Sequence, residues 1–111
     1  PFTNDGRRVG YINAYNPGVR ENGGQYTHAA AQYLIALWQC GMKEKAFEIL
    51  SVLNPAVRCK DKELAERYKA EPYALCGDIC SNPEMPGRGG WALYTGSSAW
   101  YWCAIDEIFG L

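Results

Sequence analysis

A mainly α-helical fold is predicted by the periodicity of apolar residues along the 111-residue sequence. In the stretches 26–38 and 46–53, apolar residues recur every three to four positions, as on one face of an amphipathic helix. The stretch 97–109 is apolar on nearly every side, which is typical of a buried helix. No stretch alternates apolar and polar residues long enough to predict a strand. The helices are expected to form a small bundle or adjacent pairs of a larger helical barrel, and the apolar last helix favours the barrel.

The first half of the chain is expected to contain a loop followed by a helical hairpin. Residues 1–24 carry Gly, Asn and Pro at short intervals and predict an extended or loop lead-in to a helical part, 25–111, of one small domain. One helix is expected from Tyr26, with Gly41 following it as a C-terminal stop, and a second over 43–53. Because the turn between them is short, the two helices should pack antiparallel.

The second half is expected to hold shorter helices joined by Gly- and Pro-rich loops. The Asn-Pro pair at 54–55 ends the hairpin, since the residue before proline avoids helical dihedral angles. A short helix is predicted over 61–68, and Pro72 can begin another that covers 73–80. After the loop "SNPEMPGRGGW", the final helix is predicted over 97–109.

Composition excludes several classes of protein. The formal net charge is -1 and no block of Lys or Arg exists, so neither a nucleic-acid partner nor direct membrane contact is expected. No run of ~18 apolar residues and no basic-then-apolar leader is present. The chain opens at Pro1 without a methionine and stops directly after an apolar segment, so we expect a piece of a longer protein.

The cysteines predict a reducing compartment, and we expect a cytoplasmic location. They are odd in number and include no CxxC pair, and several lie inside apolar stretches, where free thiols pack as small hydrophobes. Cys76 and Cys80 would share a helix face, but a zinc site needs about four ligands and His28 is the chain's only imidazole. A metal site is therefore not expected, nor is an organic cofactor implied.

Two segments share a design that suits anion binding, in which a Gly-rich loop leads to the start of a helix. They are "GVRENGGQYTHAA" and "GRGGWALYTGSSAW". Free backbone N–H groups and the helix dipole favour an anion at such a start, and glycine lets a phosphate approach the backbone. Thr95 and Gly96 stand before the predicted last helix, and His28 lies in the first turn of the first one.

Plain structural roles are the alternative for the same segments. Thr27 and either Ser97 or Ser98 are suitable helix caps, and the glycines can simply form tight turns. "TGSS" lacks the lysine and the spacing of a P-loop, which excludes nucleotide binding by that route. Glycosidic-bond chemistry uses a carboxylic acid of raised pKa, but no carboxylate here has a distinctive local signature. Those in the less polar surroundings are Glu21, Glu71 and Asp78.

Several long motifs follow one another from about Tyr15 to near the end of the chain: "YNPGVRENGGQYTHAA", "SVLNPAVR", "RYKAEPY" and "GRGGWALYTGSSAWYW". In this order they closely resemble the C-terminal part of the catalytic domain of glycoside hydrolase family 94. That family comprises inverting β-glucoside phosphorylases and the phosphorylase-like region of cyclic β-1,2-glucan synthases, and "RENGGQYTHAA" and "ERYKAEPY" look most like the synthase branch. The resemblance implies part of an (α/α)6 barrel, its last third or so, with helical hairpins joined by Gly- and Pro-rich loops.

The resemblance also implies roles for individual residues. In the family, the histidine of "ENGG…H" and the Thr-Gly of the "TG" motif contact inorganic phosphate. The tyrosine before the first motif and the basic residue before its glutamate line the acceptor-sugar side, and the glutamate either orients that basic residue or binds sugar hydroxyls. The implied phosphate-binding residues are His28, Thr95 and Gly96. The implied substrate-binding residues are Tyr15, Arg20 and Glu21.

In the implied reaction, phosphate attacks the anomeric carbon of a β-linked glucoside with inversion, while an aspartic acid protonates the leaving oxygen. No position here matches that aspartate, so no catalytic residue is assigned and the isolated segment is expected to be inactive. Disaccharide phosphorylases tend to carry a glutamine near phosphate where this chain has Gly77 and Asp78, which again favours the glucan-synthase branch.

The leading hypothesis is therefore a catalytic-domain fragment of a β-glucoside phosphorylase or cyclic β-1,2-glucan synthase, with inorganic phosphate as co-substrate. The expected partners are a β-glucan oligosaccharide and the remainder of the catalytic domain. The alternatives are a non-catalytic helical module that binds glucan or holds a larger synthase together, and a plain structural helical domain. In isolation, uncovered apolar helix faces are expected to cause instability or self-association.

Overall fold

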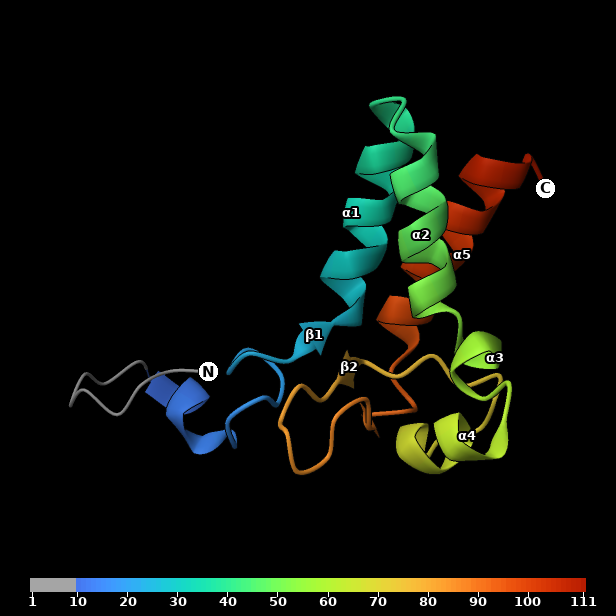
Figure 1. Ribbon diagram of the computed structural model, residues 1–111. Coiled ribbons are helices and arrows are strands. Elements are labelled where there is room, and N and C mark those ends of the chain that lie inside the picture. Colours follow the sequence, from blue (N-terminus) through green and yellow to red (C-terminus); the bar gives the residue numbers. More distant parts are fainter. Residues whose placement is uncertain (1–9) are drawn as a thin grey trace.

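Three helices packed side by side surround the main core of the structure, a computed structural model that describes residues 10–111 (Figure 1). They are α1 (Thr27–Gln39), α2 (Lys43–Leu53) and α5 (Thr95–Phe109). Their apolar faces share one core, because each helix presents small or branched side chains at helical spacing. Its buried members are Ala31, Leu34, Leu37, Ala46, Leu50, Leu53 and Ala104.

The predicted hairpin is confirmed, since α1 and α2 run antiparallel and pack against each other (Figure 1). Gly41 makes the turn with φ +76°, a left-handed conformation that glycine adopts without steric cost. The predicted short helix over 61–68 is confirmed as α4 (Lys62–Tyr68). Asp61 caps α4, because its Oδ1 accepts a hydrogen bond from the Leu64 backbone N–H at 2.9 Å.

The Asn-Pro pair ends α2 as predicted, and it also begins a one-turn helix that the sequence reasoning did not include. This is α3 (Pro55–Arg58), in which Asn54 is the N-cap and accepts from the Ala56 N–H at 2.9 Å. Proline at the first helical position needs no N–H partner, which explains how one Asn-Pro pair ends one helix and begins another.

The predicted helix over 73–80 is wrong. The segment instead contains β2 (Asp78–Ile79), the centre of a small antiparallel sheet between β1 (Gln25–Tyr26) and β3 (Gly89–Gly90). The segment 74–80 is buried throughout, so its backbone groups need partners, and two neighbouring strands supply them. Cys76 and Cys80 therefore share no helix face.

The predicted lead-in over 1–24 contains one short 3-10 helix, Gly10–Ala14, and is otherwise loop up to Gly24. Residues 1–9 of the predicted lead-in lie outside the described residues. The loop that follows is held against the segment after β2. The Ser81 hydroxyl donates to the Gly23 carbonyl at 2.7 Å, and the Asn82 side-chain amide donates to the Pro17 carbonyl at 2.9 Å. These bonds fix the loop that carries Arg20.

Helix α5 begins two residues earlier than predicted and is not buried on every side by the rest of residues 10–111. Only Ser97 and Ala104 of this helix are buried, and Trp102 is 63% exposed. Its inner face packs on α1 and α2, and the Tyr101 hydroxyl donates to the Leu50 carbonyl at 3.4 Å. Within the described range, no helix is long and apolar enough to cross a membrane.

Candidate functional site

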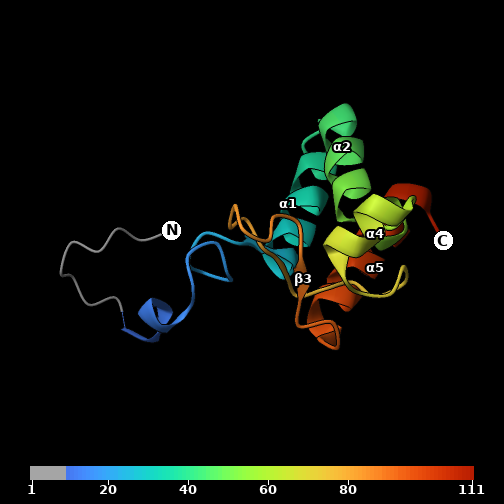
Figure 2. The same ribbon diagram turned by 60° about the horizontal axis from the view of Figure 1, so that its bottom comes forward.

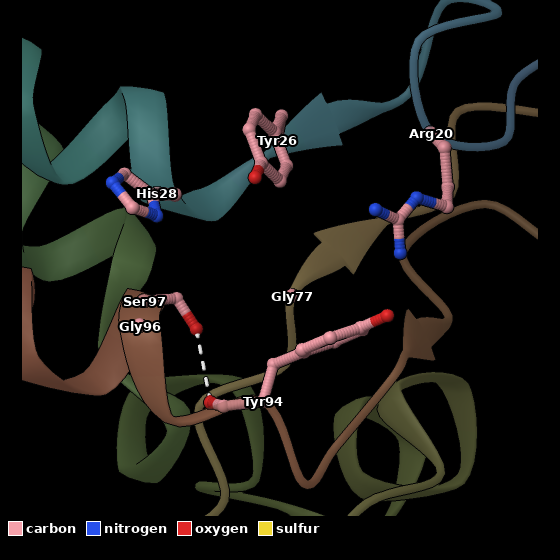
Figure 3. A pocket seen from close by; sticks show the side chains of 7 residues that line it. All are labelled: Arg20, Tyr26, His28, Gly77, Tyr94, Gly96 and Ser97. Atoms are coloured by element: carbon pink, nitrogen blue, oxygen red, sulfur yellow. Dashed lines mark hydrogen bonds between the residues drawn. The ribbon is translucent and has the colours of Figure 1, made fainter.

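A pocket of about 100 Å³ lies where α1 and α5 begin. Figure 3 shows the side chains that line it, with His28 and Ser97 on one side and the Arg20 guanidinium near the Tyr94 hydroxyl on the other. The lining residues are Arg20, Tyr26, His28, Gly77, Tyr94, Gly96 and Ser97. The fold thus brings together residues from both Gly-rich segments that the sequence singled out.

The small sheet explains why the two helix starts meet. Strand β1 leads directly into α1, and β3 precedes α5 by a short loop, while β2 lies between the two strands. The Thr27 N–H donates to the Gly77 carbonyl at 2.9 Å, and the Gly77 N–H donates to the Trp91 carbonyl at 3.2 Å. The segment 77–79 therefore connects the start of α1 with the loop that leads into α5. In Figure 2 the lower end of the molecule comes forward and shows β3.

The predicted caps at these two helix starts are wrong. The N-cap residues are Tyr26 and Tyr94, and neither makes a side-chain capping bond. The Thr27 hydroxyl accepts from the Gln25 side-chain amide at 3.2 Å, and the Ser97 hydroxyl donates to the Tyr94 carbonyl at 3.4 Å. No described side chain caps α5, and Gly96 and Ser97 of its first turn line the pocket, so free N–H groups and the positive end of the helix dipole lie at the pocket wall.

His28 and Gly96 face each other across the junction. A Cβ at position 96 would lie 3.4 Å from His28 Nδ1, which shows how closely the start of α5 approaches the imidazole. The imidazole stacks on Tyr26 at 6.0 Å between centroids and is tilted against Trp100 at 5.9 Å. Thr95 begins α5 and is exposed, and it does not line the pocket.

Arg20 provides the positive charge of the pocket and lies among aromatic rings. Its Cζ is 4.8 Å from the Trp91 centroid, 5.5 Å from Tyr94, 5.9 Å from Tyr26 and 6.0 Å from Tyr15. Such contacts favour the charged guanidinium. Desolvation by burial lowers the pKa of Arg20, but the Tyr94 hydroxyl and the nearby carboxylates outweigh it and raise the pKa above its ordinary value. Arg20 therefore stays charged.

The other predicted acceptor-side residues lie beside Arg20 and outside the pocket lining. Tyr15 contributes one of the rings around the guanidinium, and the Tyr15 carbonyl accepts from the Asn22 side-chain amide at 2.8 Å. Glu21 Oε2 is 3.8 Å from Arg20 Nε, a long ion pair that is partly exposed. This placement is compatible with Glu21 orienting Arg20.

Asp78 is the residue whose structural role the sequence reasoning missed, since it was weighed as a possible acid and as a departure from the glutamine of disaccharide phosphorylases. Its side chain is 2% exposed, and its Oδ2 accepts from the Arg20 backbone N–H at 3.0 Å. That bond holds Arg20 at φ +48°, a left-handed conformation that is uncommon for residues other than glycine. Asp78 Oδ1 is buried and has no hydrogen-bond partner among the described residues. The signal available in the sequence was an acidic residue within the mostly apolar stretch 74–80, which indicates a buried carboxylate with a structural partner.

No group of three or more His, Cys, Asp and Glu side chains within residues 10–111 is arranged to hold a metal ion. The cysteines are free thiols there, and burial raises the pKa of Cys76, so this thiol stays protonated. Cys40 and Cys103 are exposed, although their apolar surroundings in sequence predicted packing.

These observations define a helical segment with a cationic pocket at two helix starts, and comparison with known proteins gives its class. Residues 1–110 match the model of the glycosyl hydrolase 94 superfamily, catalytic domain. The chain belongs to this superfamily, and its helices are part of an α/α-barrel catalytic domain. The resemblance noted in the sequence is thereby confirmed.

Individual relatives come from both branches of the family. The chain is 45% identical over 103 residues to the cyclic beta-(1,2)-glucan synthase NdvB of Rhizobium meliloti (strain 1021), covering 92% of this chain. It is 26% identical over 112 residues to the N,N'-diacetylchitobiose phosphorylase of Vibrio proteolyticus and 28% identical over 105 residues to that of Vibrio furnissii. These alignments cover 99% and 93% of this chain. The chain spans only 4% of the synthase and 14% and 13% of the phosphorylases.

Proposed function

We propose that the pocket binds inorganic phosphate and that the chain forms part of the active site of an enzyme that acts on β-linked glucosides. The observation that carries this proposal is the meeting of Arg20, His28 and the uncapped start of α5 in one pocket. A guanidinium, an imidazole and free backbone N–H groups together suit a small tetrahedral anion. Thr95 would add its hydroxyl and backbone at the edge of the same helix start.

The proposed reaction is the attack of phosphate on the anomeric carbon of a β-glucoside, with inversion and release of α-glucose 1-phosphate. The pocket would hold phosphate beside His28 and Gly96. Arg20, supported by Tyr15 and Glu21, would face the phosphate from the acceptor-sugar side. The general acid would come from outside this chain. Similarity to the glucan synthase at 45% identity favours a β-1,2-linked glucan as the sugar substrate.

One assay tests the proposed reaction. The full-length protein that carries this chain is incubated with inorganic phosphate and β-linked gluco-oligosaccharides of defined linkage, and α-glucose 1-phosphate is measured. We expect release from a β-1,2-linked oligosaccharide. No release from any linkage would refute the phosphorolytic function.

Replacing His28 with alanine is expected to raise the KM for phosphate by about 10- to 150-fold, as for the loss of one charge-assisted hydrogen bond of ~1.5–3 kcal/mol. The measurement is the initial rate of phosphorolysis against phosphate concentration. An unchanged KM for phosphate would show that His28 does not bind phosphate and has a purely structural role. Tyr33→Ala, a change on an exposed side chain of α1, is the control for general effects on the helix.

A second candidate is a non-catalytic module that binds glucan within a larger synthase. It is favoured by the absence of any carboxylate from the pocket lining among residues 10–111. Binding of a β-glucan without phosphorolysis would support this candidate.

For either function, we propose that the remainder of the catalytic domain covers the exposed apolar face of α5. The isolated chain would then self-associate through this face.

A further inference from the structure

We propose that Trp91 is a stacking platform for a glucosyl unit of the substrate, at the outer edge of the pocket. This inference rests on the proposed function and names a subsite within it. Trp91 lies between β3 and α5 and borders the pocket through two lining residues, Arg20 and Tyr94. It was not among the residues that the sequence assigned to substrate.

The backbone of Trp91 is held in a conformation that a bulky residue rarely adopts. Its φ is +58°, in the left-handed region, where a non-glycine residue is strained. The Trp91 carbonyl accepts from the Gly77 N–H at 3.2 Å and from the Tyr94 N–H at 3.4 Å, so both strand β2 and the start of α5 fix it. Strained residues that persist in this way cluster at ligand sites, which calls for a functional reason for an indole at this position.

The indole is presented to solvent next to the pocket. The Trp91 residue is 52% exposed, although tryptophan is among the residues with most to gain from burial. Its ring centroid is 4.8 Å from Arg20 Cζ and 5.4 Å from the Tyr94 ring, with 41° between the two ring planes. The two rings are thus tilted against each other, with the Arg20 guanidinium close to both.

The pocket is small for an oligosaccharide. Its volume of about 100 Å³ lies below the ~300–1,000 Å³ of typical sites for larger organic ligands. The glucosyl units must then lie over the rim. The C–H face of a β-linked pyranose is apolar and packs on an aromatic ring, while its hydroxyls need donors and acceptors at the ring edge. The Arg20 guanidinium lies over the Trp91 ring, so a sugar would pack on the part of the indole that Arg20 leaves exposed. Arg88 lines a cavity of about 140 Å³ that Trp91 also borders.

The test is a pair of substitutions in the full-length protein, Trp91→Gly and Trp91→Phe, with KM measured separately for a β-1,2-linked glucan trisaccharide and for phosphate. Glycine suits φ +58° and offsets part of the cost of losing the contacts of the indole with Arg20 and Tyr94, so Trp91→Gly should remain folded, which its melting transition checks. We expect its KM for the trisaccharide to rise at least about tenfold and its KM for phosphate to change less than about twofold. Trp91→Phe, which keeps an aromatic face, should retain most of the affinity.

Leu93→Ala is the matched control, because Leu93 is in the same loop and 95% exposed, and it should leave both KM values unchanged. An unchanged KM for the trisaccharide in Trp91→Gly would overturn the proposal, and so would an equal rise in both KM values. Calorimetric binding of the trisaccharide separates the two levels of inference. If the wild type binds the trisaccharide without phosphorolysis and Trp91→Gly does not bind it, the proposed reaction is refuted but the stacking role of Trp91 is supported. Equal binding by both proteins would overturn the stacking role.

Discussion

Arg20→Gly is expected to lower kcat/KM for phosphorolysis by about 10- to 150-fold while changing the free energy of unfolding by no more than about 1 kcal/mol. The loss of activity follows from removing a charged donor worth ~1.5–3 kcal/mol to a bound anion or hydroxyl. The stability is nearly kept because two effects oppose each other. The aromatic contacts of the guanidinium are lost, but the left-handed backbone at φ +48° becomes unstrained.

Two further variants separate the side chain of Arg20 from its backbone. Arg20→Ala should lose the same activity as Arg20→Gly but be less stable than it by about 1 kcal/mol, since alanine keeps the left-handed strain. Arg20→Lys should recover only part of the activity, because an ammonium keeps the charge without the planar fork that lies among the rings. Chemical denaturation and steady-state kinetics give both quantities. Full activity in Arg20→Gly would remove Arg20 from the proposed site.

The sequence predicted the helices best where periodicity and end signals agreed. The hairpin α1–α2 and helix α4 follow from apolar spacing together with Gly41 and the Asp61 cap, which are local features. The helix prediction over 73–80 was wrong because the conformation of this segment depends on residues far away in the chain. Its apolar run fits a buried strand as well as a helix, and only the pairing of Asp78 with Tyr26 and Gly90 decides between them.

The candidate site shows the same division between local and distant causes. The two Gly-rich segments identified Arg20, His28 and Gly96 as neighbours of helix starts, which needs only local sequence. Their meeting in one pocket depends on the sheet, and the sheet depends on β2, which was predicted as a helix. Asp78 was missed for this reason, since its contact with the Arg20 backbone spans 58 positions.

Gly90→Ala is expected to disrupt the site through Asp78 without touching any pocket-lining residue. A Cβ at position 90 would lie 2.4 Å from Asp78 Oδ1 and 3.3 Å from its Cγ, so the carboxylate must move. Because Asp78 is fully enclosed, overpacking of ~1–3 kcal/mol should lower the free energy of unfolding. The displaced carboxylate also loses the Arg20 backbone N–H, and we expect kcat/KM to fall by at least about tenfold.

The control for this effect is a glycine of equal cost elsewhere. Gly41→Ala places a Cβ in open space at φ +76° and should lose ~1–2 kcal/mol of stability with no change in kcat/KM. A double-mutant cycle then locates the cause. In an Asp78→Ala background the clash with the carboxylate is gone, so adding Gly90→Ala should lower the free energy of unfolding by less than about 0.5 kcal/mol. If the losses of the two single variants simply add, Asp78 does not transmit the effect of Gly90→Ala. Since Oδ2 of the same carboxylate fixes Arg20, coupling between positions 78 and 90 would show that the geometry of the cationic pocket is set from the sheet behind it.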